Sequence, residues 1–192
     1  MTTFLQLHIL TAYPAANLNR DDTGSPKTMK FGGADRLRVS SQSLKRAIRT
    51  SDLFASAIGA NLGTRSQSFA RSLVAALVTR GIEEKDAVAH VRSVIEADKL
   101  GKLKKDAADT EQLVHLGPDE IARLDALADA LARGETPDAK STLVLLEKPK
   151  AVDIAMFGRM LADNPAYNVE AAVQVAHAFT THRVTVEDDY YT

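Results

Sequence analysis

The sequence predicts an α+β fold, in which a small region of strands and loops is interrupted by a large helical insertion. An apolar, partly alternating run over residues 4–10 is typical of a buried strand. Residues 51–140 are rich in Ala, Leu and charged residues at helical spacing, and residues 141–186 return to mixed strand and helix patterns. With 192 residues, 45% of them hydrophobic, the chain can bury a core as one domain with an inserted subdomain.

A loop over residues 13–33 is expected after the first strand, because Pro, Asn, Asp and Gly are frequent there. Loops of this length are usually functional or disordered. Residues 36–39 predict a short strand, and Ser40 or Ser41 is expected to cap a helix that ends near Arg49. One face of that helix is apolar and expected to be buried, with Leu44, Ala47 and Ile48. The opposite face is polar, with Gln42, Lys45, Arg46 and Arg49.

The helical insertion is predicted from apolar residues that recur every three or four positions. Its clearest helix lies between Pro118 and Gly134, which mark a helix start and a helix end. Two further helices are expected over residues 66–80 and 84–99. After the insertion we expect a strand over 141–146, helices over 153–161 and 169–178, and an extended segment over 182–186.

Charge is distributed unevenly along the chain. Residues 1–50 carry eight Lys and Arg against three acidic residues, while the rest of the chain has a net charge of −6. A basic first quarter on an acidic body indicates a localised anion-binding face, although clustering on an ordinary solvated surface remains open.

Several classes of protein and site are disfavoured by composition. The chain has no cysteine, which excludes disulfides and thiolate zinc sites and fits a cytoplasmic protein. No signal peptide is recognisable, and no apolar run reaches the roughly 18 residues of a membrane span. The five histidines are scattered, so we expect no metal site and no cofactor.

The segment from Phe31 to Arg49 carries the clearest binding pattern. A helix N-terminus suits phosphate, and Ser40 and Ser41 lie at that end with hydroxyl donors. Lys45 and Arg49 follow one and two turns later, which would form a track of donors along one helix. An ordinary polar helix face, with serines that merely cap, is the alternative.

These residues also lie in a longer pattern. Asn17-Leu18-Asn19-Arg20-Asp21-Asp22, Phe31-Gly32-Gly33 and Arg38-Val39-Ser40-Ser41-Gln42-Ser43-Leu44-Lys45-Arg46 follow one another. A later block has Val152-Asp153-Ile154-Ala155, Gly158-Arg159-Met160 and Ala176-His177-Ala178-Phe179-Thr180-Thr181-His182. In order and spacing, the two blocks resemble the backbone subunit family of the type I-E CRISPR Cascade complex (the CasC family).

The resemblance implies a hand-shaped fold. A palm with a modified RNA-recognition-motif-like fold would begin in residues 1–58, helical fingers would span 59–175, and 176–192 would return to the palm and start a thumb. Chains of that family are about twice as long, so the resemblance covers their N-terminal half and ends before the thumb.

The resemblance further implies a non-catalytic subunit that polymerises along CRISPR RNA and presents it for pairing with target DNA in antiviral defence. Its partners would be CRISPR RNA, a target DNA strand, other copies of itself and other Cascade subunits, with no membrane. The expected RNA-binding residues are Arg20, Lys27, Arg38, Ser40, Ser41, Gln42, Lys45, Arg46, Arg49, Met160, Tyr190, Tyr191 and Thr192. Basic and polar residues would hold phosphates, Met160 would wedge against bases, and the tyrosines would stack.

Two other functions stay open at this point. A metal-dependent ribonuclease of a related CRISPR effector would use Asp21 and Asp22 to hold Mg²⁺. These aspartates could instead stabilise the turn or pair with Arg20. A protein-interaction module built on the acidic helices would show no salt-sensitive RNA binding.

Overall fold

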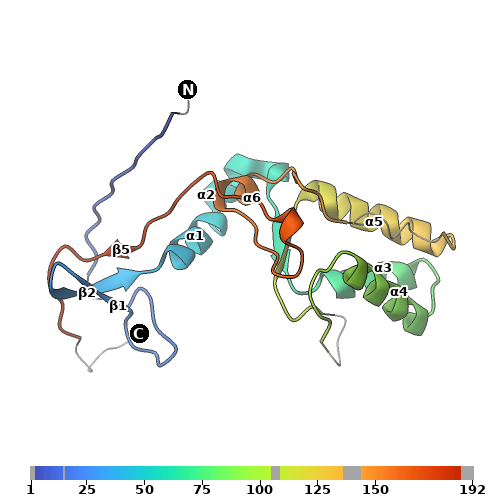
Figure 1. The fold of residues 1–192 in the computed structure, drawn as a ribbon, viewed down its shortest axis with the longest axis horizontal. Helices are drawn as coiled ribbons and strands as arrows, with labels where there is room; N and C mark the ends of the chain where they lie inside the picture. The colour runs from blue at the N-terminus through green and yellow to red at the C-terminus, as the bar shows by residue number, and fades with distance from the viewer. Residues whose placement is uncertain (1–2, 15, 105–108, 136–143, 187–192) are drawn as a thin grey trace. The chain divides into compact units, whose positions relative to one another are not determined.

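The computed structural model describes residues 3–14, 16–104, 109–135 and 144–186, whose fold is drawn in Figure 1. Helices and small antiparallel sheets occur together, which confirms the α+β class. The chain forms two compact units: unit 1 is Met1–Ala47 with Val175–Thr192, and unit 2 is Ile48–Gln174. The finer division into palm, fingers and thumb stays a prediction.

Unit 1 contains a three-stranded antiparallel sheet in the order β1-β2-β5. β1 (Thr28–Phe31) and β2 (Ala34–Val39) form a hairpin in which Phe31 pairs with Ala34. Gly32 and Gly33 form its two-residue turn with φ of 61° and 74°, the positive values that such tight hairpin turns require. The strand predicted over 36–39 is confirmed, whereas the prediction of a structureless loop up to residue 33 is wrong because the hairpin begins at Thr28.

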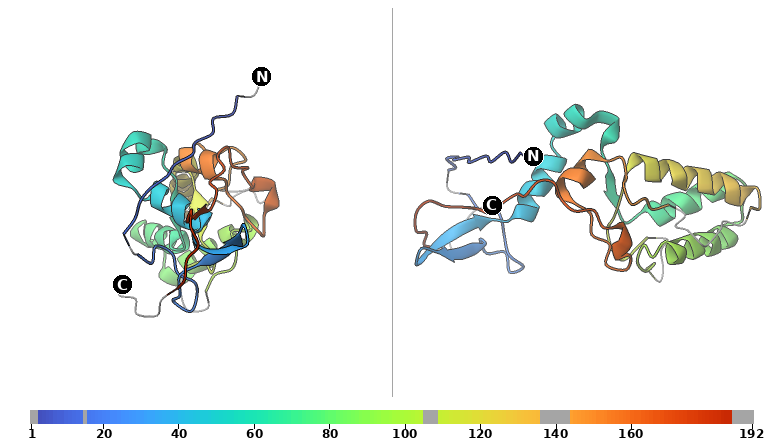
Figure 2. Two further views of the ribbon diagram at one scale, coloured as in Figure 1. Left: turned by 90° about the vertical axis from the view of Figure 1, so that its left-hand side faces the viewer. Right: turned by 45° about the horizontal axis from the view of Figure 1, so that its top comes forward.

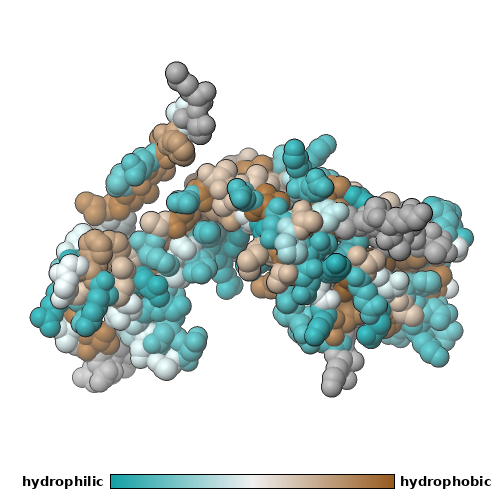
Figure 3. Space-filling view, viewed as in Figure 1, coloured by the Kyte–Doolittle hydropathy of each residue, from teal (hydrophilic) through white to brown (hydrophobic). Residues whose placement is uncertain are grey.

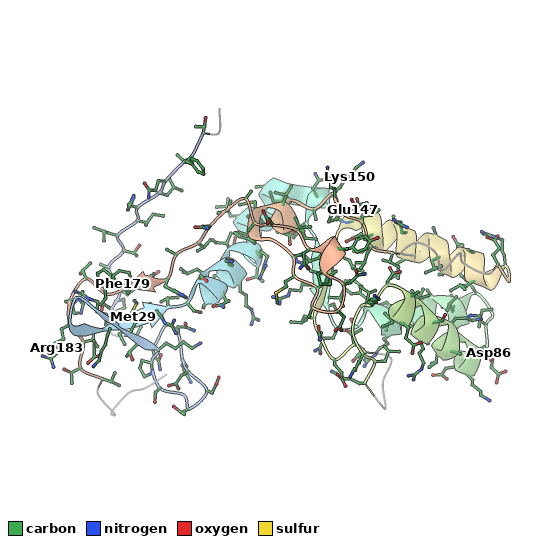
Figure 4. The ribbon with its side chains drawn as sticks, in the orientation of Figure 1. Met29, Asp86, Glu147, Lys150, Phe179 and Arg183 are labelled. Carbon is green, nitrogen blue, oxygen red and sulfur yellow. The ribbon has the colours of Figure 1, made fainter. Side chains whose placement is uncertain are left out.

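The third strand ties the end of the chain to this hairpin. β5 (Ala178–Phe179) pairs with β2 so that Phe179 lies opposite Arg38. Phe179, labelled in Figure 4, packs against Phe31 with ring centroids 4.9 Å apart. The Arg36 guanidinium donates to the backbone carbonyls of Phe31 and Thr180 at 3.1 Å and 2.8 Å, which fixes both strands.

The strand predicted over residues 4–10 is wrong. These residues have no regular structure and stay exposed, with Phe4 90% accessible to solvent. In Figure 3 the arm that leads to the N-terminus is largely brown, the colour of hydrophobic residues. A strand needs a partner for its backbone groups, and among the described residues no strand pairs with this segment.

Unit 2 is built on helices around a hydrophobic core. Its three longest helices are α3 (Phe69–Thr79), α4 (Glu84–Ala97) and α5 (Pro118–Ala132), and α3 packs against both of the others, as Figure 2 shows. Each helix buries one apolar face. The buried residues include Leu73 and Leu77 of α3, Val91 and Ile95 of α4, and Leu124 and Leu131 of α5. These helices confirm those predicted over residues 66–80 and 84–99 and between Pro118 and Gly134.

Two short strands of unit 2 were not predicted. β3 (Thr64–Ser66) and β4 (Val114–Leu116) pair antiparallel, with Arg65 opposite His115. Each strand has three residues, which is too short for an alternating pattern to appear in the sequence. A short helix, α2 (Asp52–Ile58), precedes β3 and is capped by Ser51, whose hydroxyl accepts from Phe54 N at 3.3 Å.

The predictions for the later residues of unit 2 are largely wrong. Residues 141–143 lie outside the described residues, and residues 144–146 form no strand. The N–H groups of Val144 and Leu145 donate instead to the Asp98 carboxylate, at 2.7 Å and 3.0 Å. The helix expected over 153–161 is the shorter α6 (Val152–Phe157), which stops at Gly158 with φ of 79°.

The helix predicted over residues 169–178 is also wrong. This segment is irregular, and the N–H groups of Ala172 and Val173 donate to the carbonyls of Ala155 and Met156 on α6. Tertiary hydrogen bonds therefore override the helical preference of its alanines. Among the described residues, no helix is long and apolar enough to cross a membrane.

Candidate nucleic-acid interface

The basic helix α1 (Ser41–Arg49) begins at a fully formed cap. The Ser40 hydroxyl accepts from Ser43 N at 3.3 Å, and the Ser40 carbonyl accepts from Leu44 N at 3.1 Å. Ser40 is buried at 6% exposure, and Ser41 N donates to His177 Nδ1 at 3.0 Å. The structure thus gives Ser40 a capping role, and its role as an RNA contact stays a prediction.

The polar face of α1 carries the predicted donors. Lys45 and Arg49 lie four residues apart, one turn of the helix, and both are half-buried, while Gln42 is exposed. The Arg49 guanidinium lies over the Phe157 ring, 5.7 Å from its centroid. The fourth predicted donor on this helix, Arg46, is exposed.

The predicted burial of the opposite face is wrong. Every residue of α1 keeps part of its surface exposed, and Ile48 is 38% accessible to solvent. The hydrophobic core of unit 2 is formed by α3, α4 and α5 with the segments packed on them, and no residue of α1 belongs to it. Leu44 is half-buried, and Ala47 is exposed.

The loop before β1 places Arg20 and Lys27 close to the start of α1. The backbones of Arg20 and Pro26 form an isolated antiparallel β-bridge, and Lys27 N donates to the Asn19 carbonyl at 2.8 Å. The Asn19 side chain accepts from Ser40 N at 2.9 Å, which joins the loop to the helix cap. Sequence reasoning gave Asn19 no role, because this bond connects residues 21 positions apart.

Asp21 stabilises this loop. Its carboxylate accepts from Thr23 N, Thr23 Oγ1 and Ser25 N at 2.9, 2.7 and 3.0 Å. The hydrogen bond from the Thr23 hydroxyl, more than those from the backbone, lowers the pKa of Asp21 below its ordinary value. The turn-stabilising role left open by the sequence is therefore present in the structure.

Arg38 presents a donor that the described residues do not satisfy. It lies on β2 between the hairpin partner β1 and β5, and its N–H donates to the Lys27 carbonyl at 2.8 Å. Its Nε is buried and has no hydrogen-bond partner among the described residues. Buried donors without partners are rare, so an acceptor other than the described residues, such as a water molecule, is expected at this group.

Met160 lies in unit 2 and is 82% exposed. Its neighbour Arg159 is buried, and the Arg159 guanidinium contacts both carboxylate oxygens of Glu120 at 2.8 Å and 2.7 Å. Backbone bonds at 2.9 Å in both directions between Arg159 and Val169 fix the segment further. An exposed apolar side chain is thus held on a rigid backbone, which suits a wedge between bases.

A second buried pair supports β4 from α6. His115 Nε2 lies 2.8 Å from Asp153 Oδ2, and the other oxygen of Asp153 accepts from Gly63 N at 2.8 Å. Burial acts to raise the pKa of Asp153, but the bonds from His115 and Gly63 outweigh it and lower that pKa. Sequence reasoning assigned neither buried pair, although Asp153 and Arg159 stand in the second block of the resemblance.

Three predicted RNA-binding residues, Tyr190, Tyr191 and Thr192, lie outside the described residues. Among the residues that are described, no group of three or more His, Cys, Asp or Glu side chains is placed to hold a metal ion.

Comparison with known proteins gives a family and a fold. The model of the family described as CT1975-like protein matches residues 5–192. A chain of a solved CRISPR RNA-guided surveillance complex is 35% identical with a TM-score of 0.69, over 89% of this chain and 56% of that one. In a pre-nicking form of such a complex, the matching chain is 35% identical with a TM-score of 0.74, over 92% and 54%. No curated protein matches.

The present chain therefore spans about half the length of the structural chains it matches. The family model, in contrast, covers nearly all of it. The resemblance to CRISPR Cascade backbone subunits that the sequence predicted is confirmed, and the chain belongs to the CT1975-like protein family.

Proposed function

We propose that this chain is a non-catalytic backbone subunit of a CRISPR RNA-guided surveillance complex in antiviral defence, and that it binds CRISPR RNA along its sugar-phosphate backbone. The observation that carries the proposal is the collection of donors in unit 1, with Arg20 and Lys27 on the loop, Arg38 on β2 and Lys45 on α1. The similarity of 35% to chains of such complexes supports it.

Backbone recognition follows from the chemistry of these side chains. Guanidinium and ammonium groups neutralise phosphates, and such contacts carry no sequence information. The guide RNA would then read the target DNA strand by base pairing while the protein holds its backbone. Further copies of this chain and other subunits of the complex are the expected protein partners, in the cytoplasm, around a palm with an RNA-recognition-motif-like fold.

Salt dependence of RNA binding tests the proposal. Fluorescence anisotropy with unrelated single-stranded RNAs should give similar affinities that fall steeply with salt. Lys45→Ala should weaken binding to all of them and reduce the slope of log K against log salt by about 0.7. Lys85→Ala, which removes the same charge from an exposed position on α4, is the matched control. A change in sequence preference on Lys45→Ala would contradict backbone recognition.

A ribonuclease is the second candidate, and the loop argues against it. Asp21 already accepts three hydrogen bonds within the loop, all on Oδ1, so this oxygen is engaged in holding the turn. We expect no Mg²⁺-dependent cleavage of RNA by the protein. Cleavage that disappears on Asp21→Ala or Asp22→Ala would establish the enzyme instead.

A further inference from the structure

A second arginine lies close to Arg49 in unit 2. Arg65 is the middle residue of β3 and is paired with His115 of β4, and directly opposed residues of an antiparallel pair share one face. His115 contacts Asp153 at 2.8 Å, and Asp153 and Phe157 lie one turn apart on α6. Arg49 covers the Phe157 ring at 5.7 Å, so the two arginines approach the same small cluster.

Neither of these guanidinium groups is neutralised within the described part of the chain. There, Arg71, Arg80, Arg133 and Arg159 each have a carboxylate oxygen within 2.7 Å, whereas Arg49 and Arg65 have none within 4 Å. Asp153 is the acid beside them, and its two oxygens are occupied by His115 and Gly63 N.

The positive charges of Arg49 and Arg65 repel each other. Burial lowers the pKa of Arg49 most, the positive charge of Arg65 lowers it further, and Asp153 opposes both effects. Two neighbouring cations that lack a counter-charge are stabilised by an anion that accepts hydrogen bonds from both. Guanidinium groups suit a phosphate in particular, because their planar forks donate two hydrogen bonds each.

We propose that Arg65 and Arg49 together bind one backbone phosphate of the RNA, which makes Arg65 an RNA-binding residue. The inference rests on the proposed function and adds a position in unit 2 to the predicted set. A phosphate is favoured over a carboxylate of another protein because Arg49 continues the line of donors that Lys45 begins one turn earlier on α1. The Phe157 ring holds the Arg49 guanidinium in place for this contact.

The test compares Arg65→Ala with Arg92→Ala, which removes the same charge from an exposed position on α4. We expect Arg65→Ala to weaken binding of unrelated single-stranded RNAs several-fold and to reduce the salt slope by about 0.7, with Arg92→Ala unchanged. Arg65→Lys should retain part of the affinity. Thermal unfolding followed by circular dichroism checks that each variant is folded.

A double variant tests whether the phosphate is shared. If both arginines hold one phosphate, Arg49→Ala with Arg65→Ala should reduce the slope by about 0.7, as each single variant does, rather than by about 1.4. Additive losses would overturn the shared site.

The possible failures are distinct. No salt-sensitive RNA binding by the unaltered protein would overturn the proposed function and this inference with it. Normal RNA binding in a folded Arg65→Ala variant would overturn the inference alone. If that variant instead lost self-association in light scattering without RNA, the ligand would be a carboxylate of a second copy and the phosphate assignment would be wrong.

Discussion

Unit 1 and unit 2 differ in what holds them together. Among the described residues, every buried apolar side chain belongs to unit 2, and Ser40 is the single buried residue of unit 1. Unit 2 also holds the buried Arg159–Glu120 ion pair and the buried contact of His115 with Asp153, while unit 1 relies on backbone hydrogen bonds, an Asx turn and a pair of phenylalanines. Most of the predicted RNA donors are thus placed on a sheet and a helix with little hydrophobic support of their own.

The largest loss in the free energy of unfolding is expected when a buried ion pair of unit 2 is broken. Glu120→Ala leaves the Arg159 guanidinium buried without its carboxylate and should lower the free energy of unfolding by about 3–5 kcal/mol. Denaturant titration measures it, with the exposed Glu96→Ala as control. The double variant Glu120→Leu with Arg159→Met, which buries no charge, should be more stable than Glu120→Ala. An equally damaged double variant would mean that packing, rather than charge, explains the loss.

Truncation of one apolar side chain in each unit should show the difference in hydrophobic stabilisation between the two units. Leu77 of α3 is completely buried, so Leu77→Ala should cost about 2–5 kcal/mol. Phe31 of β1 is half exposed, and Phe31→Ala should cost clearly less because less apolar area leaves water on folding. Equal losses in urea unfolding would show that unit 1 has a core comparable to that of unit 2.

A pH-dependent effect is expected from Asp153. Its pKa is lowered in the folded state, so its contribution to stability is complete above the ordinary value of 3.8 and is lost as pH falls through the folded value. Asp153→Asn should therefore flatten the decline of the melting temperature below the ordinary value of 3.8. Asp86→Asn, at the exposed position labelled in Figure 4, should leave the decline unchanged. A parallel decline in Asp153→Asn would contradict this assignment.

The smallest effect is expected in unit 1, at the cap of α1. Ser40→Ala removes the acceptor of Ser43 N and should cost about 1 kcal/mol, and Ser40→Gly should cost less. Calorimetry measures both, with the exposed Ser56→Ala as control. Unchanged stability in Ser40→Ala, together with weakened RNA binding, would make Ser40 an RNA contact instead of a cap.

The sequence predicted what depends on neighbours along the chain. The helices α3, α4 and α5 follow from apolar spacing, and α1 follows from its capping serine, because both signals act within a few residues. The strand expected over 4–10 and the helix expected over 169–178 failed, since pairing with distant residues decides both. For the same reason the donors on α1 could be predicted as a line, whereas Arg65 needed the register of β3 against β4.

The uncovered arm of residues 4–10 has a practical consequence for anyone who handles this protein. Five of its seven side chains are apolar and largely exposed: Phe4, Leu5, Leu7, Ile9 and Leu10. No strand among the described residues pairs with this segment, and an extended apolar segment of this kind readily pairs with a like segment of another molecule. Concentrated samples are therefore expected to aggregate on storage, and Leu7→Lys should slow this aggregation.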